Sequence, residues 1–288
     1  MFDLILRVAH EDARIRAVYM NGSRTNPNVP KDLFQDYDIV YVSTQTRPFV
    51  EDPHWIDRFG ERLYLQRPDE VDCWNDGSVP DYDAGFTWLI QFRDGNRLDL
   101  HIEPLERTAV LDDKLCVVLL DKDGILPQLP EPTDRDYWVK RPTQRQFWAA
   151  CNEFWWCMNN VAKGLWRGEI PYVQDMLNLY VRPELVRLLS WEAGLQTGFT
   201  CSVGKSGKYL YRWLPAETWR AFLGTYAGGT VDALWDAALS MCALFDREAR
   251  RAADALGFAY REQEADASFA HLRHVHALPR DAAEIYPG

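Results

Sequence analysis

Two aspartates stand at the start of a strand-like run in this chain of 288 residues. Asp36 and Asp38 flank Tyr37 and lead directly into the apolar run 39–42. Because side chains alternate between the faces of a strand, both carboxylates project from the same face. Carboxylates held this close repel each other unless a cation or hydrogen bonds compensate. A Mg²⁺ ion bound by a few carboxylates and by substrate phosphate oxygens suits this arrangement.

A third carboxylate lies in the stretch RDGNRLDLHI, which begins with a hairpin signal. The alternation of Leu98, Leu100 and Ile102 predicts an inward apolar face, which places Asp99 on the opposite face. Asp99 then joins the first two aspartates if the two strands are neighbours. Each motif alone is a weak signal, because aspartates often cap loops or flank strands. The three carboxylates together are much more specific.

The turn at Gly22 and Ser23 follows another strand-like run, residues 15–20. It offers backbone N–H groups and a hydroxyl, which are suited to binding phosphate. Arg24 follows directly and is poised to assist. A glycine–serine turn alone is a weaker signal than the aspartates, but next to them it predicts a phosphate site.

The elements that position these residues change character along the chain. Short strand-like runs fill the first half: residues 15–20, 37–42, 62–66, 87–92, 97–102 and 116–120. Helical segments are expected at residues 2–11, near 53–60 and at 104–113. This mixture predicts an α+β domain with a mixed β-sheet over residues 1–130.

The second half of the chain is helical. A proline-rich segment without periodicity, residues 123–143, is predicted to be a linker. Helices are expected at residues 143–168, 170–194, 215–226, 231–256 and 262–281. In the first of them, one apolar stripe predicts the face toward the core: Phe147, Cys151, Phe154, Met158, Val161 and Leu165. We therefore expect a C-terminal α-helical bundle domain over residues 131–288.

Composition limits the classes of function. The formal net charge of -11 opposes binding to nucleic-acid phosphates and favours cationic partners. Six cysteines without a Cys-x-x-Cys pair indicate reduced thiols in a cytoplasmic protein. The sequence shows neither a signal-peptide pattern nor an apolar run of membrane-spanning length. We expect a cytoplasmic monomer that binds neither nucleic acid nor a membrane.

Several stretches together resemble one known family. Residues 21–42, NGSRTNPNVPKDLFQDYDIVYV, resemble the Gly-Ser…Asp-x-Asp signature of the nucleotidyltransferase superfamily, which includes DNA polymerase β. More narrowly, the chain resembles the aminoglycoside 6-adenylyltransferases, or streptomycin adenylyltransferases. Further matching stretches are QFRDGNRLDLHI, LLDKDG, YWVKRPTQRQFWAACNEFWWCMNNVAKGLWRGEI and VGKSGKYL. The resemblance covers nearly the whole chain.

The resemblance implies transfer of AMP from ATP to the 6-hydroxyl of streptomycin, with release of pyrophosphate and resistance to the antibiotic. Residues 1–130 would form the nucleotidyltransferase domain, in which Asp36 and Asp38 hold Mg²⁺ bridging the triphosphate. Asp99 would either complete the metal site or take the proton from the attacking hydroxyl. The residues expected to bind the departing phosphates are Gly22, Ser23 and Arg24.

The helical half offers two candidate substrate contacts. On the helix at 143–168, Glu153, Trp156 and Lys163 lie opposite the core stripe. Such a face is usually just solvated, but a large aromatic among polar residues often lines a cleft. If it borders the active site, Lys163 contacts phosphates, while Glu153 and Trp156 bind the cationic acceptor.

The stretch GKSGKYL lacks the spacing of a Walker A motif, and a flexible surface loop is its simplest interpretation. Alternatively, Lys205 or Lys208 contacts the triphosphate and Tyr209 lies against the base or the ribose.

Residues 68–92 contain no lysine or arginine but combine acidic and aromatic side chains. Acidic loops are usually only solvated. For a guanidinium-bearing sugar, however, carboxylates and aromatic faces are suitable ligands. We therefore predict an acceptor-binding loop that includes Trp74, Asp76 and Asp81.

Two alternatives compete with this interpretation. A related nucleotidyltransferase with an RNA or a protein acceptor is the first; the acidic balance argues against RNA more than against a protein. A non-catalytic, antitoxin-like module of the same fold is the second. The intact carboxylates disfavour it, because an inactive protein has no physical need for charges that repel one another.

Overall fold

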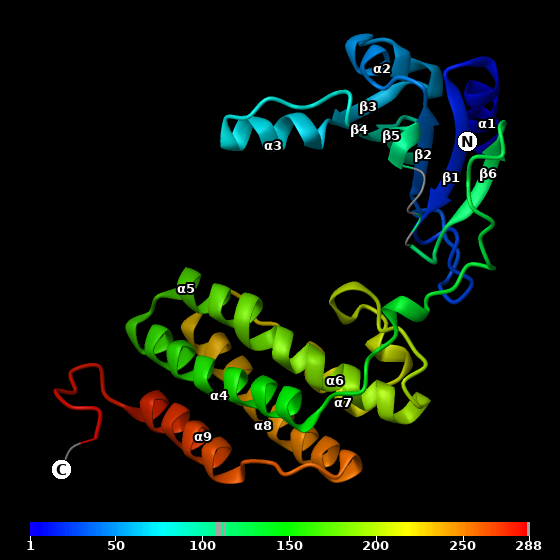
Figure 1. The fold of residues 1–288 in the computed structure, drawn as a ribbon. Coiled ribbons are helices and arrows are strands. Elements are labelled where there is room, and N and C mark those ends of the chain that lie inside the picture. Colours follow the sequence, from blue (N-terminus) through cyan, green and yellow to red (C-terminus); the bar gives the residue numbers. More distant parts are fainter. Residues whose placement is uncertain (108–110, 112, 287–288) are drawn as a thin grey trace. The chain divides into compact units, whose positions relative to one another are not determined.

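The computed structural model describes residues 1–107, 111 and 113–286 of the chain. They belong to two compact units, and the boundary lies between Asp136 and Tyr137 (Figure 1). The first unit contains a β-sheet and the second is helical, as the sequence predicts.

The N-terminal unit is built on a six-stranded mixed sheet. Its strands are β1 (Ile15–Asn21), β2 (Tyr37–Ser43), β3 (Arg62–Gln66), β4 (Phe86–Phe92), β5 (Arg97–Pro104) and β6 (Val117–Asp121). The order across the sheet is β3-β4-β5-β2-β1-β6. Neighbours β2 and β5 run parallel, whereas the other paired strands are antiparallel. The prediction of a mixed sheet is therefore confirmed.

One face of this sheet carries the larger core of the unit. The helices α1 (Phe2–Glu11) and α2 (Arg47–Glu51) and the 3₁₀ turn Trp55–Phe59 supply apolar side chains to it. The predicted inward residues of β5 are fully buried there: Leu98, Leu100 and Ile102. The alternation of β5 therefore leaves Asp99 on the other face of the sheet.

The helix expected at residues 104–113 is wrong. β5 continues to Pro104 because its parallel pairing with β2 extends to Ser43, and a 3₁₀ turn, Leu105–Arg107, follows. The rest of the expected helix lies partly outside the described residues. Here strand pairing overrides the local helical pattern.

The proline-rich segment belongs in part to the N-terminal unit. Leu126 and Leu129 pack against a small cluster on the second sheet face, which includes Val40 and Val42. Asp134 is buried, with 4% of its surface exposed. Apolar packing thus extends the unit to Asp136, beyond the expected end at residue 130.

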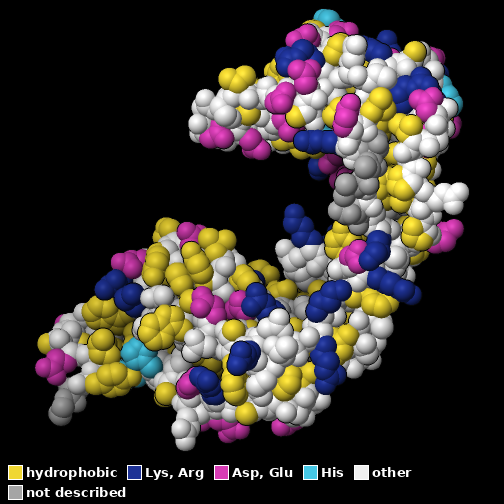
Figure 2. Space-filling model, in the orientation of Figure 1, with side chains coloured by type: hydrophobic (Ala, Val, Ile, Leu, Met, Phe, Trp, Pro, Cys, Tyr) yellow, Lys and Arg dark blue, Asp and Glu magenta, His cyan; other side chains and the backbone are white. Residues whose placement is uncertain are grey.

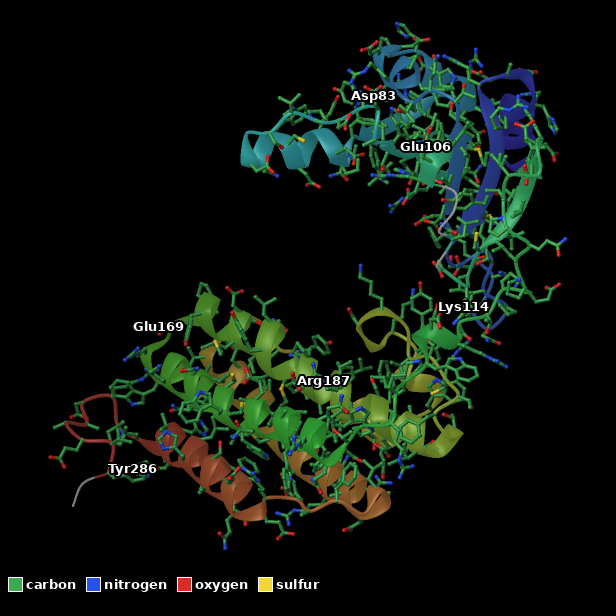
Figure 3. All side chains as sticks on the ribbon, in the orientation of Figure 1. Asp83, Glu106, Lys114, Glu169, Arg187 and Tyr286 are labelled. Atoms are coloured by element: carbon green, nitrogen blue, oxygen red, sulfur yellow. The ribbon has the colours of Figure 1, made fainter. Side chains whose placement is uncertain are left out.

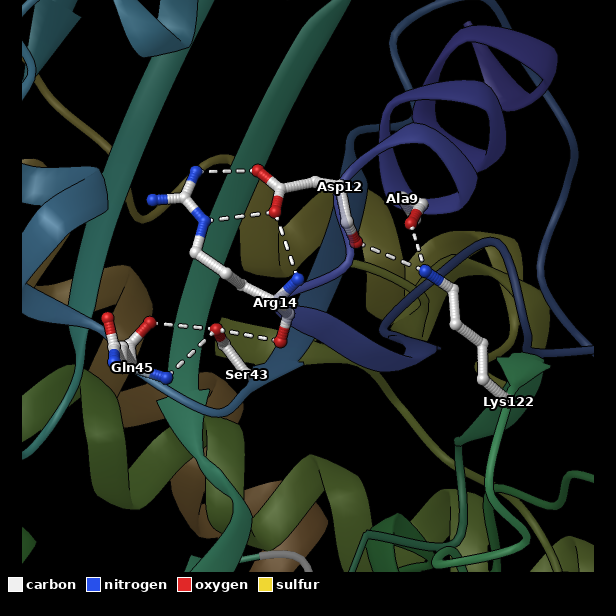
Figure 4. A network of polar contacts seen from close by, with 6 residues as sticks. All are labelled: Ala9, Asp12, Arg14, Ser43, Gln45 and Lys122. Carbon is white, nitrogen blue, oxygen red and sulfur yellow. Dashed lines mark hydrogen bonds and ion pairs between the residues drawn. The ribbon is translucent and has the colours of Figure 1, made fainter.

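A polar brace ties α1 to the edge of the sheet (Figure 4). Arg14 donates to both carboxylate oxygens of Asp12, at 2.9 and 2.6 Å. Lys122 donates to the carbonyl oxygens of Ala9 and Asp12, at 2.6 and 3.1 Å. The hydroxyl of Ser43 donates to the carbonyl of Arg14 at 3.1 Å. This brace holds the start of β1 and the end of β2.

The helical unit contains α4 (Gln144–Arg167), α5 (Ile170–Asp175), α6 (Arg182–Thr197), α7 (Ala216–Leu223), α8 (Val231–Leu256) and α9 (Glu262–Ala277). Thr143 begins α4 with a capping box, and Gly168 ends it in the left-handed region. The predicted apolar stripe of α4 is buried in the core. A π-helical segment, Met176–Val181, interrupts the helix expected at 170–194. Among the described residues, no helix combines the length and apolar character that a bilayer crossing requires.

The core of the helical unit also contains two acidic side chains. Glu192 of α6 and Glu248 of α8 are 9% and 1% exposed. Glu248 accepts from Arg247 at 2.8 Å, from Arg251 at 3.1 Å and from Thr218 at 3.3 Å. Burial and the neighbouring Glu248 carboxylate raise the pKa of Glu192. Neither carboxylate oxygen of Glu192 has a hydrogen-bond partner among the described residues.

Candidate active site

The sheet brings the predicted carboxylates together at one edge. Asp38 of β2 pairs in register with Asp99 of β5 and, on its other side, with Asn21 of β1. Register partners of neighbouring strands point to the same face. Asp36 directly precedes β2 and is half-buried. The site therefore lies where β1 ends and β2 and β5 begin.

The guanidinium of Arg97 contacts the carboxylates of this site. Its Nε and Nη2 donate to the two oxygens of Asp99, at 2.8 and 2.7 Å. Its Nη1 lies 3.7 Å from Oδ2 of Asp36. The sequence placed Arg97 on the same face as Asp99 but gave it no role; the signal was its two-residue spacing from Asp99.

Burial and neighbouring charges shift the pKa values of the carboxylates in the site. Burial, followed by the charges of Asp99 and Asp36, raises the pKa of Asp38 to about 6. Burial also raises the pKa of Asp36, against the opposing effect of Arg97. The hydrogen bonds to Asp99 raise the pKa of the Arg97 guanidinium further. The carboxylates are thus incompletely compensated, and an added cation would stabilise them.

Gly22 is required at its position by both space and conformation. Its φ is +79°, in the left-handed region that favours glycine. A Cβ atom there would lie 2.0 Å from Oδ2 of Asp38. The turn and the carboxylate therefore pack against each other, as the predicted phosphate site next to a metal site requires.

The loop between β1 and β2 is held by its own polar side chains. Arg24 donates to the carbonyl oxygens of Asp36 and Gln35, at 2.9 and 2.6 Å. Its guanidinium also stacks on the ring of Tyr37, 3.7 Å from the centroid. Gln35 in turn donates to the carbonyl of Ser23 at 3.1 Å. These contacts give Arg24 a role in positioning Asp36.

The chemistry of the donor set fits a divalent cation. Asn21 is the register partner of Asp38, and its buried Oδ1 has no hydrogen-bond partner among the described residues. This oxygen and the carboxylates of Asp36 and Asp38 are ligands that Mg²⁺ accepts. Within the described ranges, no group of three His, Cys, Asp or Glu side chains is already arranged to hold a metal ion. Asp99 is engaged by Arg97 instead.

The acidic segment 68–92 is not a loop throughout. Residues Pro68–Asp76 form helix α3, and residues from Phe86 onward form β4. Trp74 is exposed on α3, while Asp76 and Asp81 each accept from a backbone N–H two residues further on. Asp83, labelled in Figure 3, pairs with Arg47 at 2.7 Å.

On α4, the predicted substrate-binding residues Glu153, Trp156 and Lys163 are exposed, but they lie against different parts of the helical unit. Trp156 lines a hollow of about 500 Å³ together with residues of α9. Lys163 lines an adjoining cavity of about 220 Å³ and donates to Asn160 at 3.1 Å. Glu153 lies on the α6 side, where its charge adds to burial in raising the pKa of Glu184. The exposed aromatic Tyr180 belongs to the π-helical segment. Figure 2 shows hydrophobic side chains at the surface of the helical unit where Figure 1 labels α5.

The stretch with the two lysines forms a short 3₁₀ turn, Lys205–Gly207. Lys208 and Arg212 both lie over the ring of Tyr209, at 5.1 and 5.0 Å from its centroid. The sequence reasoning missed a basic hollow of about 460 Å³ in the same unit, which Lys140, Arg141 and Arg187 line. Lys140 and Arg141 are adjacent, but Arg187 is distant along the chain, so no local pattern marks the three as one group.

A glycine–serine turn packed against paired strand carboxylates, on a mixed sheet followed by helices, defines a nucleotidyltransferase. The family model for streptomycin adenylyltransferase matches residues 1–275. Aminoglycoside 6-adenylyltransferase of Bacillus subtilis (strain 168) is 38% identical over 92% of this chain and 93% of its own. The enzyme of the same name from Campylobacter jejuni is 40% identical over 90% and 89%. The chain belongs to the streptomycin adenylyltransferase family.

A solved structure is similar as well. The crystal structure of an aminoglycoside 6-adenyltransferase from Bacillus subtilis is 32% identical in sequence, with a TM-score of 0.49. The match covers 96% of this chain and 98% of that one.

Proposed function

We propose that this chain transfers the adenylyl group of ATP to the 6-hydroxyl of an aminoglycoside, with streptomycin as acceptor and pyrophosphate as the leaving group. The observation that carries this proposal is the in-register pair Asp38 and Asp99, with Gly22 packed against Asp38. Family membership supports the same reaction.

The N-terminal unit supplies the groups that bind and orient ATP. Asp36, Asp38 and the orphan oxygen of Asn21 would hold Mg²⁺, which when bound neutralises charge on the triphosphate. Gly22 and Ser23 present the turn to the departing phosphates. Asp99 either completes the metal site or accepts the proton of the attacking hydroxyl.

The helical unit supplies groups suited to a cationic acceptor. Glu153 offers a carboxylate, whereas the neighbouring Glu184 is already paired with Arg187 at 2.8 Å. The exposed ring of Tyr180 offers a face for a guanidinium. Trp74, Asp76 and Asp81 of the N-terminal unit and Trp156 remain proposed acceptor contacts. Lys163, Lys205, Lys208 and Tyr209 remain proposed nucleotide contacts.

The test is incubation with ATP, Mg²⁺ and a panel of aminoglycosides, followed by mass spectrometry. We expect an adenylyl adduct on streptomycin that is absent with Asp38→Ala, and reduced streptomycin sensitivity in cells that express the chain. Fragmentation or NMR of the product identifies the modified hydroxyl. An unmodified streptomycin alongside an adenylylated protein or RNA would show that the acceptor is wrong.

A further inference from the structure

The guanidinium of Arg97 contacts the carboxylates of the site directly, whereas Arg24 acts on the carboxylates of Asp36 and Asp38 through its charge alone. The Arg97 guanidinium binds Asp99 through two hydrogen bonds, at 2.8 and 2.7 Å, and reaches to 3.7 Å from Asp36. A fork with two parallel N–H···O bonds is the strongest geometry for an arginine and a carboxylate. Arg97 therefore compensates two of the three charges that the site collects.

A metal ion that takes Asp99 as a ligand beside Asp36 and Asp38 would need oxygens that Arg97 already occupies. Each oxygen of Asp99 accepts one N–H of the fork, and the third nitrogen lies on the side of Asp36. Two cations in contact with the same carboxylates repel each other at short range. A divalent ion that binds all three carboxylates therefore displaces the guanidinium from Asp99.

Arg97 has the freedom to leave. Its side chain is 43% exposed, and those of Asp36 and Asp99 are 34% and 19% exposed. Water reaches this guanidinium, so it can exchange a carboxylate for water at a lower cost than an arginine of a buried ion pair.

A second arginine–carboxylate pair with two hydrogen bonds lies in the same unit, and its carboxylate is more deeply buried. Arg14 binds Asp12 with the same two-residue spacing, but the Asp12 side chain is only 8% exposed. The Arg14 guanidinium also packs on the ring of Phe49, 3.9 Å from the centroid. That pair is fixed by packing, whereas the Arg97 pair is open to solvent.

We infer that Arg97 is the resting counter-ion of the carboxylate site and is displaced when the divalent metal ion binds. This inference rests on the proposed metal site and adds a residue that sets its affinity. Arginine suits the role because its charge is permanent at every pH at which the enzyme works. Arg97 is a positioning residue here: it keeps the carboxylates together and ionised until the metal ion replaces it.

The first test measures binding of Mn²⁺, as a probe for Mg²⁺, by electron paramagnetic resonance. Arg97→Gln should bind Mn²⁺ about fivefold to tenfold more tightly than the unmodified protein, because the competing cation is gone. Arg97→Lys keeps the charge but loses the fork, so a gain of about twofold to threefold is expected. Arg14→Gln, which removes the same charge from the fixed pair, should leave the affinity within about twofold.

The second test needs no activity and no assumption about the acceptor. In EDTA, Arg97→Gln should speed amide hydrogen exchange in β2 and β5, because the carboxylates then repel without compensation. Millimolar Mg²⁺ should reverse this loss in Arg97→Gln but not the loss in Arg14→Gln. The double variant with Asp99→Asn should also regain protection in EDTA, since one of the repelling charges is removed.

The outcomes separate the two proposals. Equal Mn²⁺ affinities in the unmodified protein and Arg97→Gln, with detectable binding in both, would overturn the role of Arg97 and leave the proposed function intact. The absence of Mn²⁺ binding at millimolar concentration in every variant would overturn both the displacement of Arg97 by the metal ion and the proposed metal site. The adenylyl-transfer assay then decides the proposed reaction independently.

Discussion

Two groups of carboxylates in this molecule face the same electrostatic problem in different surroundings. Asp36, Asp38 and Asp99 gather at a partly exposed edge of the sheet. Glu192 and Glu248 lie inside the helical unit, where little solvent reaches them. Both groups pair with partly exposed guanidiniums, of Arg97 in the first and of Arg247 and Arg251 in the second, so the difference lies in the burial of the carboxylates themselves.

The difference shows which group is open to a ligand. In the helical unit, Thr218 and Arg247 pair with Glu248, and Arg251 pairs with both Glu248 and, at 3.6 Å, Glu192. At pH values below its raised pKa, Glu192 keeps a proton, which removes the repulsion within the buried pair. In the sheet, the charge of Asp38 has no such partner and is left for a cation from solution. Like-charged side chains thus indicate a binding site only where a ligand from solution can replace the groups that neutralise them.

The largest expected effect comes from Asp38→Asn. Adenylyl transfer should fall by about a thousandfold or more, because a ligand for the metal ion and the charge opposite the triphosphate are lost. Steady-state assays measure this fall. The exposed Asp3→Asn on α1 is the control and should keep full activity.

The same variant should be more stable than the unmodified protein in EDTA. The folded-state pKa of Asp38, about 6, lies above the value for an unfolded aspartate, so ionisation costs stability as pH rises through that range. Above pH about 7 we expect a gain of about 1 kcal/mol after allowance for solvent screening, and below pH about 4 no gain. Hydrogen exchange in β2 measures it. Unchanged protection at pH 8 would mean that the charge is already compensated.

A second, smaller effect is expected from Gly22→Ala. The new methyl group would meet Oδ2 of Asp38, and the positive φ adds strain, so turnover should fall by about a hundredfold. Gly95→Ala is a matched control, because its φ is +89° and nothing lies within 4 Å of the added Cβ. Both variants should lose about 1 kcal/mol of stability from backbone strain. Equal activities of the two variants would refute the close packing of turn and carboxylate.

The smallest effect is expected from Glu192→Gln, which tests the other group. The pKa of Glu192 is higher in the folded protein than in the unfolded chain. The stability that Glu192 contributes is therefore fully present below the pKa of the unfolded chain and is lost as pH rises through the pKa of the folded protein. The unmodified protein should therefore lose about 1–2 kcal/mol of local stability between pH about 5 and 8, whereas the variant should not. Hydrogen exchange in α6 and α8, corrected for intrinsic rates, measures this. The exposed Glu217→Gln should retain the pH dependence of the unmodified protein.

Adenylyl transfer should be unchanged in Glu192→Gln at the pH optimum. A parallel loss of activity would mean that the two carboxylate groups are functionally linked. That result would contradict the division between a structural pair and a ligand-binding site.

Local patterns predicted much of the fold. The bounds of α1, α8 and β3 match the expected ones, because apolar periodicity and clear turn signals define these elements within their own sequence. Helix α3 was missed because its surface is mostly polar, which resembles a solvated loop. Its signals were present in Pro68 at the first turn, acidic residues after it, and Gly77 as a left-handed cap.

The candidate site was predicted only in its residue types. The alternation within β2 and β5 placed Asp38 and Asp99 on strand faces, but their pairing depends on the parallel register of two strands. The contact between Arg97 and Asp36 depends on the same register. Pairing between distant segments leaves no local pattern, so the reach of Arg97 to Asp36 could not be assigned from the sequence, whereas its two-residue spacing from Asp99 was visible.

That parallel register also has a consequence for folding. Strands β4 and β5 are joined by a short turn and can pair early, whereas β2 and β5 are far apart along the chain and must close a long loop first. The two aspartates face each other only after this late step. During refolding, the approach of Asp99 and its arginine to Asp38 should therefore appear with the slowest phase of sheet formation, after most secondary structure is in place.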